Sequence, residues 1–162
     1  MTQPASVNEL AGELATRFAD VSFEQPFGQE VARVSRDRYR ELATAAKGVG
    51  FEVLVDLTAV DYLPRQPRFE VVVSLLSLTK RSRLRLTVGV PEDDLHLPSL
   101  TDLYPSANFL EREVYDLFGI SFDDHPDLTR ILMPDDWEGH PLRKDYPVGA
   151  VPVQFKGSPQ SR

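Results

Sequence analysis

The chain has 162 residues, of which 41% are hydrophobic and 27% charged, values typical of a globular domain with a core of its own. Its net charge of −7 argues against nucleic acid as a partner, because neutralising phosphates requires a basic surface. The absence of cysteine excludes disulfides, thiolate zinc sites and iron–sulfur ligation by this sequence.

Neither a targeting signal nor a membrane span is expected from the hydropathy pattern. Residues 1–10 lack a basic region followed by an apolar core, so we expect no secretory signal. The most apolar run, residues 71–78, is far shorter than the roughly 20 residues that a membrane-spanning helix needs. We therefore expect the protein to reside in the cytoplasm and to associate with a membrane only through other proteins.

Two amphipathic helices are predicted in the first third of the chain. Apolar residues recur at helical spacing over residues 6–19 and again over residues 36–47. A weak strand is predicted between them, over residues 29–35. Gly48 or Gly50 can end the second helix in a left-handed conformation.

Three strands follow, near residues 51–59, 69–75 and 83–90, because apolar and polar residues alternate there with a period of two. The links between them are short, which predicts antiparallel neighbours. In the first strand the alternation assigns five residues to the buried face: Phe51, Val53, Val55, Leu57 and Ala59.

A third helix is predicted from residue 108 to the stop signal at Gly119. Asn108 is expected to cap its first turn, with Glu111 reciprocating in a capping box. Arg112 is expected to pair with Asp116 one turn further on. The buried stripe of this helix is predicted to consist of Leu110, Val114, Leu117 and Phe118.

Together these elements predict an α+β domain over residues 1–122, a small and mostly antiparallel sheet with helices on one face. The remaining residues, 123–162, are predicted to form an extended tail, since six of the thirteen prolines lie beyond Gly119. Trp137 and Tyr146 are costly to leave in water and are typical interface anchors. We therefore expect the tail to dock on a partner protein.

One cluster in the tail could carry chemistry. Asp124, His125 and Asp127, with Asp123 and His140 nearby, could supply metal ligands or acid–base groups. Their spacing matches no established metal motif, and a turn in which Asp side chains cap backbone donors is the favoured interpretation. A stand-alone metal-dependent hydrolase using the first three residues stays open as an alternative.

Two further groups of charged residues favour protein contacts over catalysis. The carboxylates on the third helix could act as acids and bases, form solvated ion pairs, or face outward to meet a partner's arginines, which we favour. Arg143 could bind a carboxylate or phosphate, but no glycine-rich phosphate cradle accompanies it, so docking is favoured.

The basic residues near the second and third strands have a simpler interpretation. Residues 80–85 carry three arginines, and Arg65 and Arg68 lie in the preceding link. A contact with anionic lipid or nucleic acid is conceivable, but a hairpin carrying solvated arginines is favoured.

Four motifs resemble one known family, and they read Glu111-Arg-Glu-Val-Tyr-Asp-Leu-Phe-Gly-Ile120, His125-Pro-Asp-Leu, Arg130-Ile-Leu and Gly139-His-Pro-Leu-Arg-Lys-Asp-Tyr-Pro147. That family is the 30-kDa subunit of respiratory complex I, known in bacteria as the C subunit of the NADH–quinone oxidoreductase. Residues 56–62 resemble its mid-domain strand and turn. The resemblance covers residues 50–147 well, the first 49 residues loosely and the end weakly.

The resemblance implies a structural subunit without redox groups, in the peripheral arm of a proton-translocating NADH–quinone oxidoreductase. There the chain would pack beside the 49-kDa-like subunit (the D subunit in bacteria), on the cytoplasmic side of the bacterial membrane. FMN and iron–sulfur clusters would be held by partner subunits, and this chain would contribute no catalytic, cofactor-binding or metal-binding residue. An equivalent subunit of a ferredoxin- or F420-linked quinone oxidoreductase, or of a membrane-bound hydrogenase, is the nearest alternative.

The resemblance also assigns the motif residues to the partner interface. These residues are Glu111, Arg112, Glu113, Tyr115, Asp116, Phe118, Gly119, His125, Pro126, Asp127, Arg130, Trp137, Gly139, Pro141, Leu142, Arg143, Lys144, Asp145, Tyr146 and Pro147.

Overall fold

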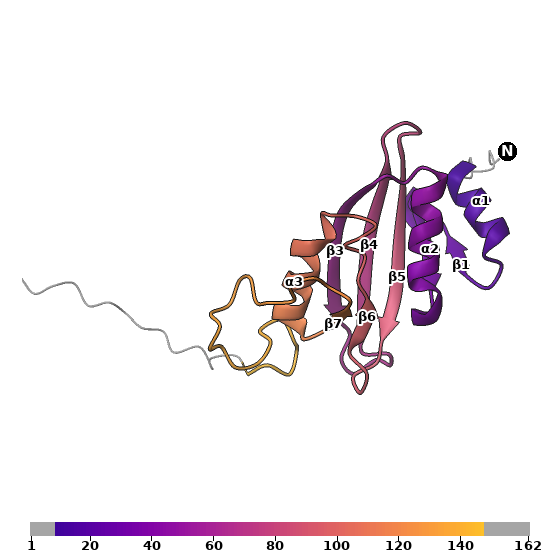
Figure 1. Ribbon diagram of the computed structural model, residues 1–162. Coiled ribbons are helices and arrows are strands. Elements are labelled where there is room, and N and C mark those ends of the chain that lie inside the picture. The colour runs from indigo at the N-terminus through magenta and orange to yellow at the C-terminus, as the bar shows by residue number, and fades with distance from the viewer. Residues whose placement is uncertain (1–8, 148–162) are drawn as a thin grey trace, which may run out of the picture.

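The computed structural model describes residues 9–147, in which helices pack on one face of a five-stranded sheet (Figure 1). The predicted α+β class is therefore confirmed, while the part of the predicted tail beyond residue 147 lies outside the described residues. The elements, in chain order, are α1 (Glu9–Arg17), β1 (Ser22–Glu24), the 3₁₀ helix η1 (Pro26–Gly28), β2 (Glu30–Val34), α2 (Arg36–Val49), β3 (Val53–Asp61), β4 (Phe69–Ser77), β5 (Ser82–Val90), β6 (His96–Pro98), α3 (Ala107–Phe118) and β7 (Ser121–Asp123).

The strands of the main sheet lie in the order β1-β2-β5-β4-β3. The hairpins β3–β4 and β4–β5 are antiparallel, as the short links predict, whereas β2 runs parallel to β5. The chain reaches β5 from β2 only after α2, β3 and β4, which makes the parallel pairing possible. A second, two-stranded sheet joins β6 to β7, close to α3 (Figure 1).

The core lies between the sheet and the three helices. Alternate residues of β4 and β5 point into it, as the period of two predicts. Gly50 ends α2 with a φ of 115°, the left-handed conformation for which glycine is suited. Fully buried members of the core include Leu14 from α1, Phe18 just after it, Tyr39 and Leu42 from α2, Phe69, Val71, Val73 and Leu75 from β4, Leu84, Leu86 and Val88 from β5, and Val114 from α3.

The prediction that Val55 lies on the buried face is wrong. A β-bulge between Leu54 and Asp56 adds one residue to β3, so that both Leu54 and Leu57 are buried. Val55 is consequently 48% exposed on the opposite face of the sheet. A strict alternation cannot reveal a bulge, because the extra residue reverses the faces on one side of it.

Among residues 9–147, no helix combines the length and the apolar character required to cross a membrane.

Candidate functional site

The carboxylate of Asp116, near the end of α3, is fully buried. It binds the outer segment, residues 129–145, which follows α3 and β7 along the chain. Its Oδ2 accepts the backbone N–H groups of Ile131, Leu132 and Met133 at 3.0, 2.8 and 2.8 Å. Its Oδ1 accepts a hydrogen bond of 2.6 Å from the guanidinium of Arg130. Burial opposes the ionisation of Asp116, but these donors outweigh it, so the pKa of the carboxyl is lowered.

The predicted pairing of Arg112 with Asp116 is wrong. The guanidinium of Arg112 instead donates 3.1 Å hydrogen bonds to the carbonyl oxygens of Thr129 and Arg130. Arg112 and Asp116 thus bind the same outer segment, one through its carbonyls and the other through its N–H groups. The sequence contains no local sign of this, because the partners lie 14 to 18 residues away.

Glu111 is also buried, which corrects the expectation that the carboxylates of α3 face outward. Its oxygens accept hydrogen bonds of 2.7 Å from the Ser99 hydroxyl and the backbone N–H of Leu100. Burial raises the pKa of Glu111 to about 7, although both donors oppose the shift. The predicted capping box is wrong as well, because Ser106 occupies the N-cap position and Asn108 lies inside the helix.

The cluster around His125 has the geometry of a turn. Its Nδ1 lies 3.0 Å from the backbone nitrogen of Asp127, from which it accepts, and its Nε2 lies 3.1 Å from the carbonyl oxygen of Asn108, to which it donates. Both ring nitrogens are therefore engaged within the chain. Asp124 is exposed, and no three potential ligands converge within residues 9–147. This arrangement does not favour the hydrolase alternative.

Gly119 ends α3 with a φ of 75° and leaves space for two side chains of the outer segment. A Cβ at this position would collide with Arg143 and His140. Arg143 donates from Nε to the backbone carbonyl oxygen of Phe118 at 2.6 Å. Nδ1 of His140 lies 2.9 Å from the backbone carbonyl oxygen of Asp116. Burial lowers the pKa of both side chains. Together they satisfy carbonyl groups at the end of the helix.

A second anchor joins the outer segment to the sheet. The guanidinium of Arg68 binds Asp61 at 2.8 Å and Asp145 at 2.7 Å, and it also contacts Glu92. The backbone N–H of Lys144 donates to Asp61 at 2.8 Å. The hydrogen bonds to Asp61 and Asp145 raise the pKa of Arg68 and lower those of both carboxyls. The interpretation of Arg68 as a solvated arginine is therefore wrong.

The outer segment turns apolar side chains toward solvent. Asp116 binds the N–H groups of Ile131 and Leu132, yet both residues are exposed, Leu132 to 60%. Leu142 donates its N–H to the carbonyl oxygen of Leu117 at 3.1 Å and is also exposed. Ile131 and Leu132 are not among the interface residues predicted individually from the sequence.

The predicted interface residues differ in how accessible they are, and their contact with a partner stays a prediction. The structure exposes Glu113, Pro126, Asp127, Gly139, Leu142, Lys144, Asp145 and Pro147. It partly buries Arg112, Tyr115, Gly119, His125, Arg130, Trp137, Pro141, Arg143 and Tyr146. It buries Glu111, Asp116 and Phe118.

The predicted boundary after residue 122 falls inside β7, and the contacts described above hold residues 130–145 on the domain. Docking of residues 123–162 on a partner stays a prediction.

The site is thus a polar anchor between a domain and its own outer segment. The family model described as respiratory-chain NADH dehydrogenase, 30 kDa subunit, matches residues 32–152, well over half of the chain. The chain belongs to this family.

Named relatives agree with this assignment. The C subunit of the NADH-quinone oxidoreductase of Saccharopolyspora erythraea is 48% identical over 135 residues, which cover 81% of this chain and 54% of the relative. Subunit 5 of the Thermus thermophilus oxidoreductase is 53% identical, covering 75% of this chain and 63% of the relative. The C subunit from Roseiflexus sp. is 61% identical, covering 65% of this chain and 60% of the relative. The chain spans between half and two thirds of the length of these relatives.

Two solved structures are similar. A trypsin-resistant fragment (1-134) of Nqo5 superposes with a TM-score of 0.66 and 44% identity, over 72% of this chain and 95% of the fragment. A chain of the archaeal membrane-bound sulfane sulfur reductase superposes with a TM-score of 0.79 over 95% of this chain and 97% of its own. Because its identity is 23%, this second likeness concerns the fold alone.

Proposed function

We propose that the chain is a structural subunit, without redox groups of its own, in the peripheral arm of a proton-translocating NADH–quinone oxidoreductase. It packs beside the 49-kDa-like subunit on the cytoplasmic side of the bacterial membrane. Its assembly supports electron transfer from NADH to quinone, while FMN and the iron–sulfur clusters belong to other subunits.

Family membership is the observation that carries this proposal. Relatives that are 48% to 61% identical bear the name of an NADH-quinone oxidoreductase subunit. The chemistry of the sequence agrees, because iron–sulfur clusters are held chiefly by cysteine thiolates and the sequence has no cysteine. Electrons therefore need a route through other chains of the complex.

The outer segment supports a docking role. Asp116, Arg112 and Arg130 bind this segment through several hydrogen bonds, which reduce the conformational entropy that it loses when a partner binds. Ile131, Leu132 and Leu142 are exposed apolar side chains on that fixed frame, which is a feature of protein interfaces.

Deletion and complementation test the proposal. Membranes from cells that lack the chain should lose NADH-dependent quinone reduction, and expression of the intact chain should restore it. Unchanged NADH–quinone activity without the chain would contradict the proposal. If the chain instead copurifies with a complex that has no NADH-oxidising subunit, it belongs to a related complex with another electron donor.

A further inference from the structure

Two arginines on β5 have no partner in the part of the chain that the structure describes. Arg83 and Arg85 lie on the same face of the strand, and both are exposed. They are two residues apart, so their Cα atoms are separated by roughly 7 Å. Most of the other arginines in residues 9–147 bind a carboxylate or a carbonyl, as Arg68 and Arg143 do. Two unpaired like charges that line the same pocket repel each other, so an anion placed between them would be stabilised.

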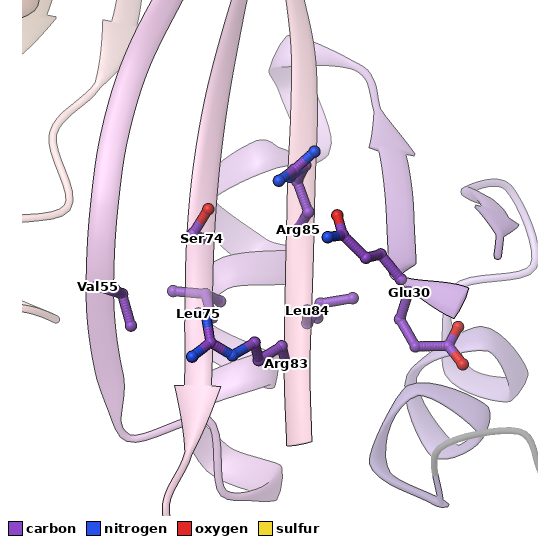
Figure 2. Close-up of a pocket in the computed structure, with 8 residues that line it drawn as sticks. Glu30, Val55, Ser74, Leu75, Arg83, Leu84 and Arg85 are labelled. Carbon is purple, nitrogen blue, oxygen red and sulfur yellow. The ribbon is translucent and has the colours of Figure 1, made fainter. Parts of the chain in front are cut away.

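A pocket of about 70 Å³ adjoins these two guanidinium groups. Figure 2 shows Arg83 extending across β4 toward Val55, while Arg85 projects from β5 above it. Ser74 of β4 lines the pocket and is the cross-strand neighbour of Arg85. The carboxylate of Glu30, on the rim, points away from both arginines (Figure 2). The pocket offers room and positive charge for one small anionic group.

The bulge in β3 adds an apolar contact beside the charges. It turns Val55 out of the core and into the wall of the pocket, although a valine in a regular strand at this position would be buried. An occupant that carries a carboxylate next to an apolar side chain would therefore satisfy both the arginines and Val55.

We infer that this face of the sheet docks an acidic segment of a partner protein, one of whose Asp or Glu side chains enters the pocket between Arg83 and Arg85. Arginine suits such a contact, because its guanidinium can bind a carboxylate through two parallel hydrogen bonds.

Charges on the same face favour a single carboxylate over a polyanion. A second groove there is lined by Asp56 and Glu70 beside Arg85 and Arg33, and Arg33 is already engaged by Glu70 and Glu24. A nucleic-acid backbone or an anionic membrane would bring phosphates against these carboxylates, whereas one inserted side chain would avoid them. The inference rests on the proposed function for the identity of the partner, another subunit of the same complex.

Charge reversal tests the inference. Arg83→Glu/Arg85→Glu should weaken association with the rest of the complex at least about tenfold, because it replaces two attractions with repulsions. Arg81→Glu is the matched control, since it removes an exposed arginine of the same run that does not line the pocket. All three positions are exposed, so both variants should keep the melting temperature of the wild-type chain. Equal association of the double variant and the control would overturn the inference.

Photo-cross-linking from the pocket identifies the occupant. With benzoylphenylalanine in place of Val55 in the full chain, irradiation of the assembled complex should label a peptide of another subunit that contains Asp or Glu. The label should be lost when Arg83→Glu/Arg85→Glu is added. Labelling of nucleic acid or lipid, of a peptide without an acidic residue, or of no partner at all would contradict the inference.

The two proposals can fail separately. If the chain assembles with NADH–quinone oxidoreductase but Val55 labels no acidic peptide, the docking inference fails alone. If Val55 labels an acidic peptide of a different complex in a way that depends on Arg83 and Arg85, the proposed function fails and the docking inference stands.

Discussion

Arg68 and Asp61 form an ion pair that is almost completely withdrawn from solvent, with Nη2 and Oδ2 2.8 Å apart and side-chain exposures of 1% and 2%. Asp145, 77 residues along the chain from Arg68, binds the same guanidinium. The link between β3 and β4 is thereby joined to the segment that follows α3. A buried charge of this kind is strongly destabilising when its partner is removed.

Arg68→Ala should lower the free energy of unfolding by about 3 to 5 kcal/mol, because it leaves the Asp61 carboxylate buried without its counter-ion. Arg65→Ala is the matched control from the same link. Arg65 is 46% exposed and binds Glu70 at 3.0 Å, so its loss should cost less than about 1 kcal/mol. Urea unfolding at pH 7 measures both losses. Equal losses would show that the buried Arg68–Asp61 pair contributes no more to stability than the exposed Arg65–Glu70 pair.

Glu111→Gln should change how stability depends on pH. Since the folded pKa of Glu111 is about 7, above its unfolded value, the wild-type carboxyl destabilises the fold progressively as pH rises from about 4.5 to 7. Glutamine does not titrate, so the stability of the variant relative to the wild type should rise by about 3 kcal/mol over this range and then level off. Urea unfolding between pH 5 and 8 tests this.

Glu113→Gln is the control for that experiment, because Glu113 is exposed on the same helix. The rise in relative stability with pH should be larger for Glu111→Gln than for this control. A flat profile for Glu111→Gln would contradict the raised pKa.

Asp116→Asn should release the outer segment from α3. The amide would present N–H groups to Arg130 in place of an oxygen, and the buried ion pair would be lost, at a cost of about 3 kcal/mol. We expect trypsin to cleave the variant after Arg130 much faster than the wild type, because local opening precedes cleavage. Asp124→Asn, at an exposed position with a φ of 62° that asparagine tolerates, should behave as the wild type. Equal cleavage rates would refute the anchor.

Gly119→Ala should destabilise the protein, because the new Cβ would meet Arg143 and His140 and the φ of 75° disfavours any side chain. Gly48→Ala supplies the opposite control. Gly48 lies inside α2 with no atom near the position of its missing Cβ, so alanine there should stabilise the helix by about 1 kcal/mol. Thermal unfolding should therefore shift in opposite directions for the two variants, and shifts of the same sign would contradict this account.

Residues that obey a local rule could be predicted from the sequence. The alternation in β4 and β5 identifies their buried residues, and Gly50 and Gly119 end their helices as expected. These features depend on neighbours a few positions away, which the sequence displays directly.

Residues whose partners are distant could not be predicted in the same way. Glu111 and Asp116 flank the apolar stripe of α3 and carry charge, so hydropathy places them in solvent. They are buried because N–H groups near residues 100 and 131–133 reach them from other parts of the fold. Arg68 is missed for the same reason, since its carboxylates lie in three separate segments.

The most direct test of the central claim is to purify the assembly through an affinity tag on this chain and to assign its redox groups by subunit. We predict an assembly that reduces quinone with NADH, in which FMN and the iron–sulfur clusters remain with other subunits when the tagged chain is separated. An assembly without an NADH-oxidising subunit, or a flavin or cluster that stays with the isolated chain, would contradict the claim.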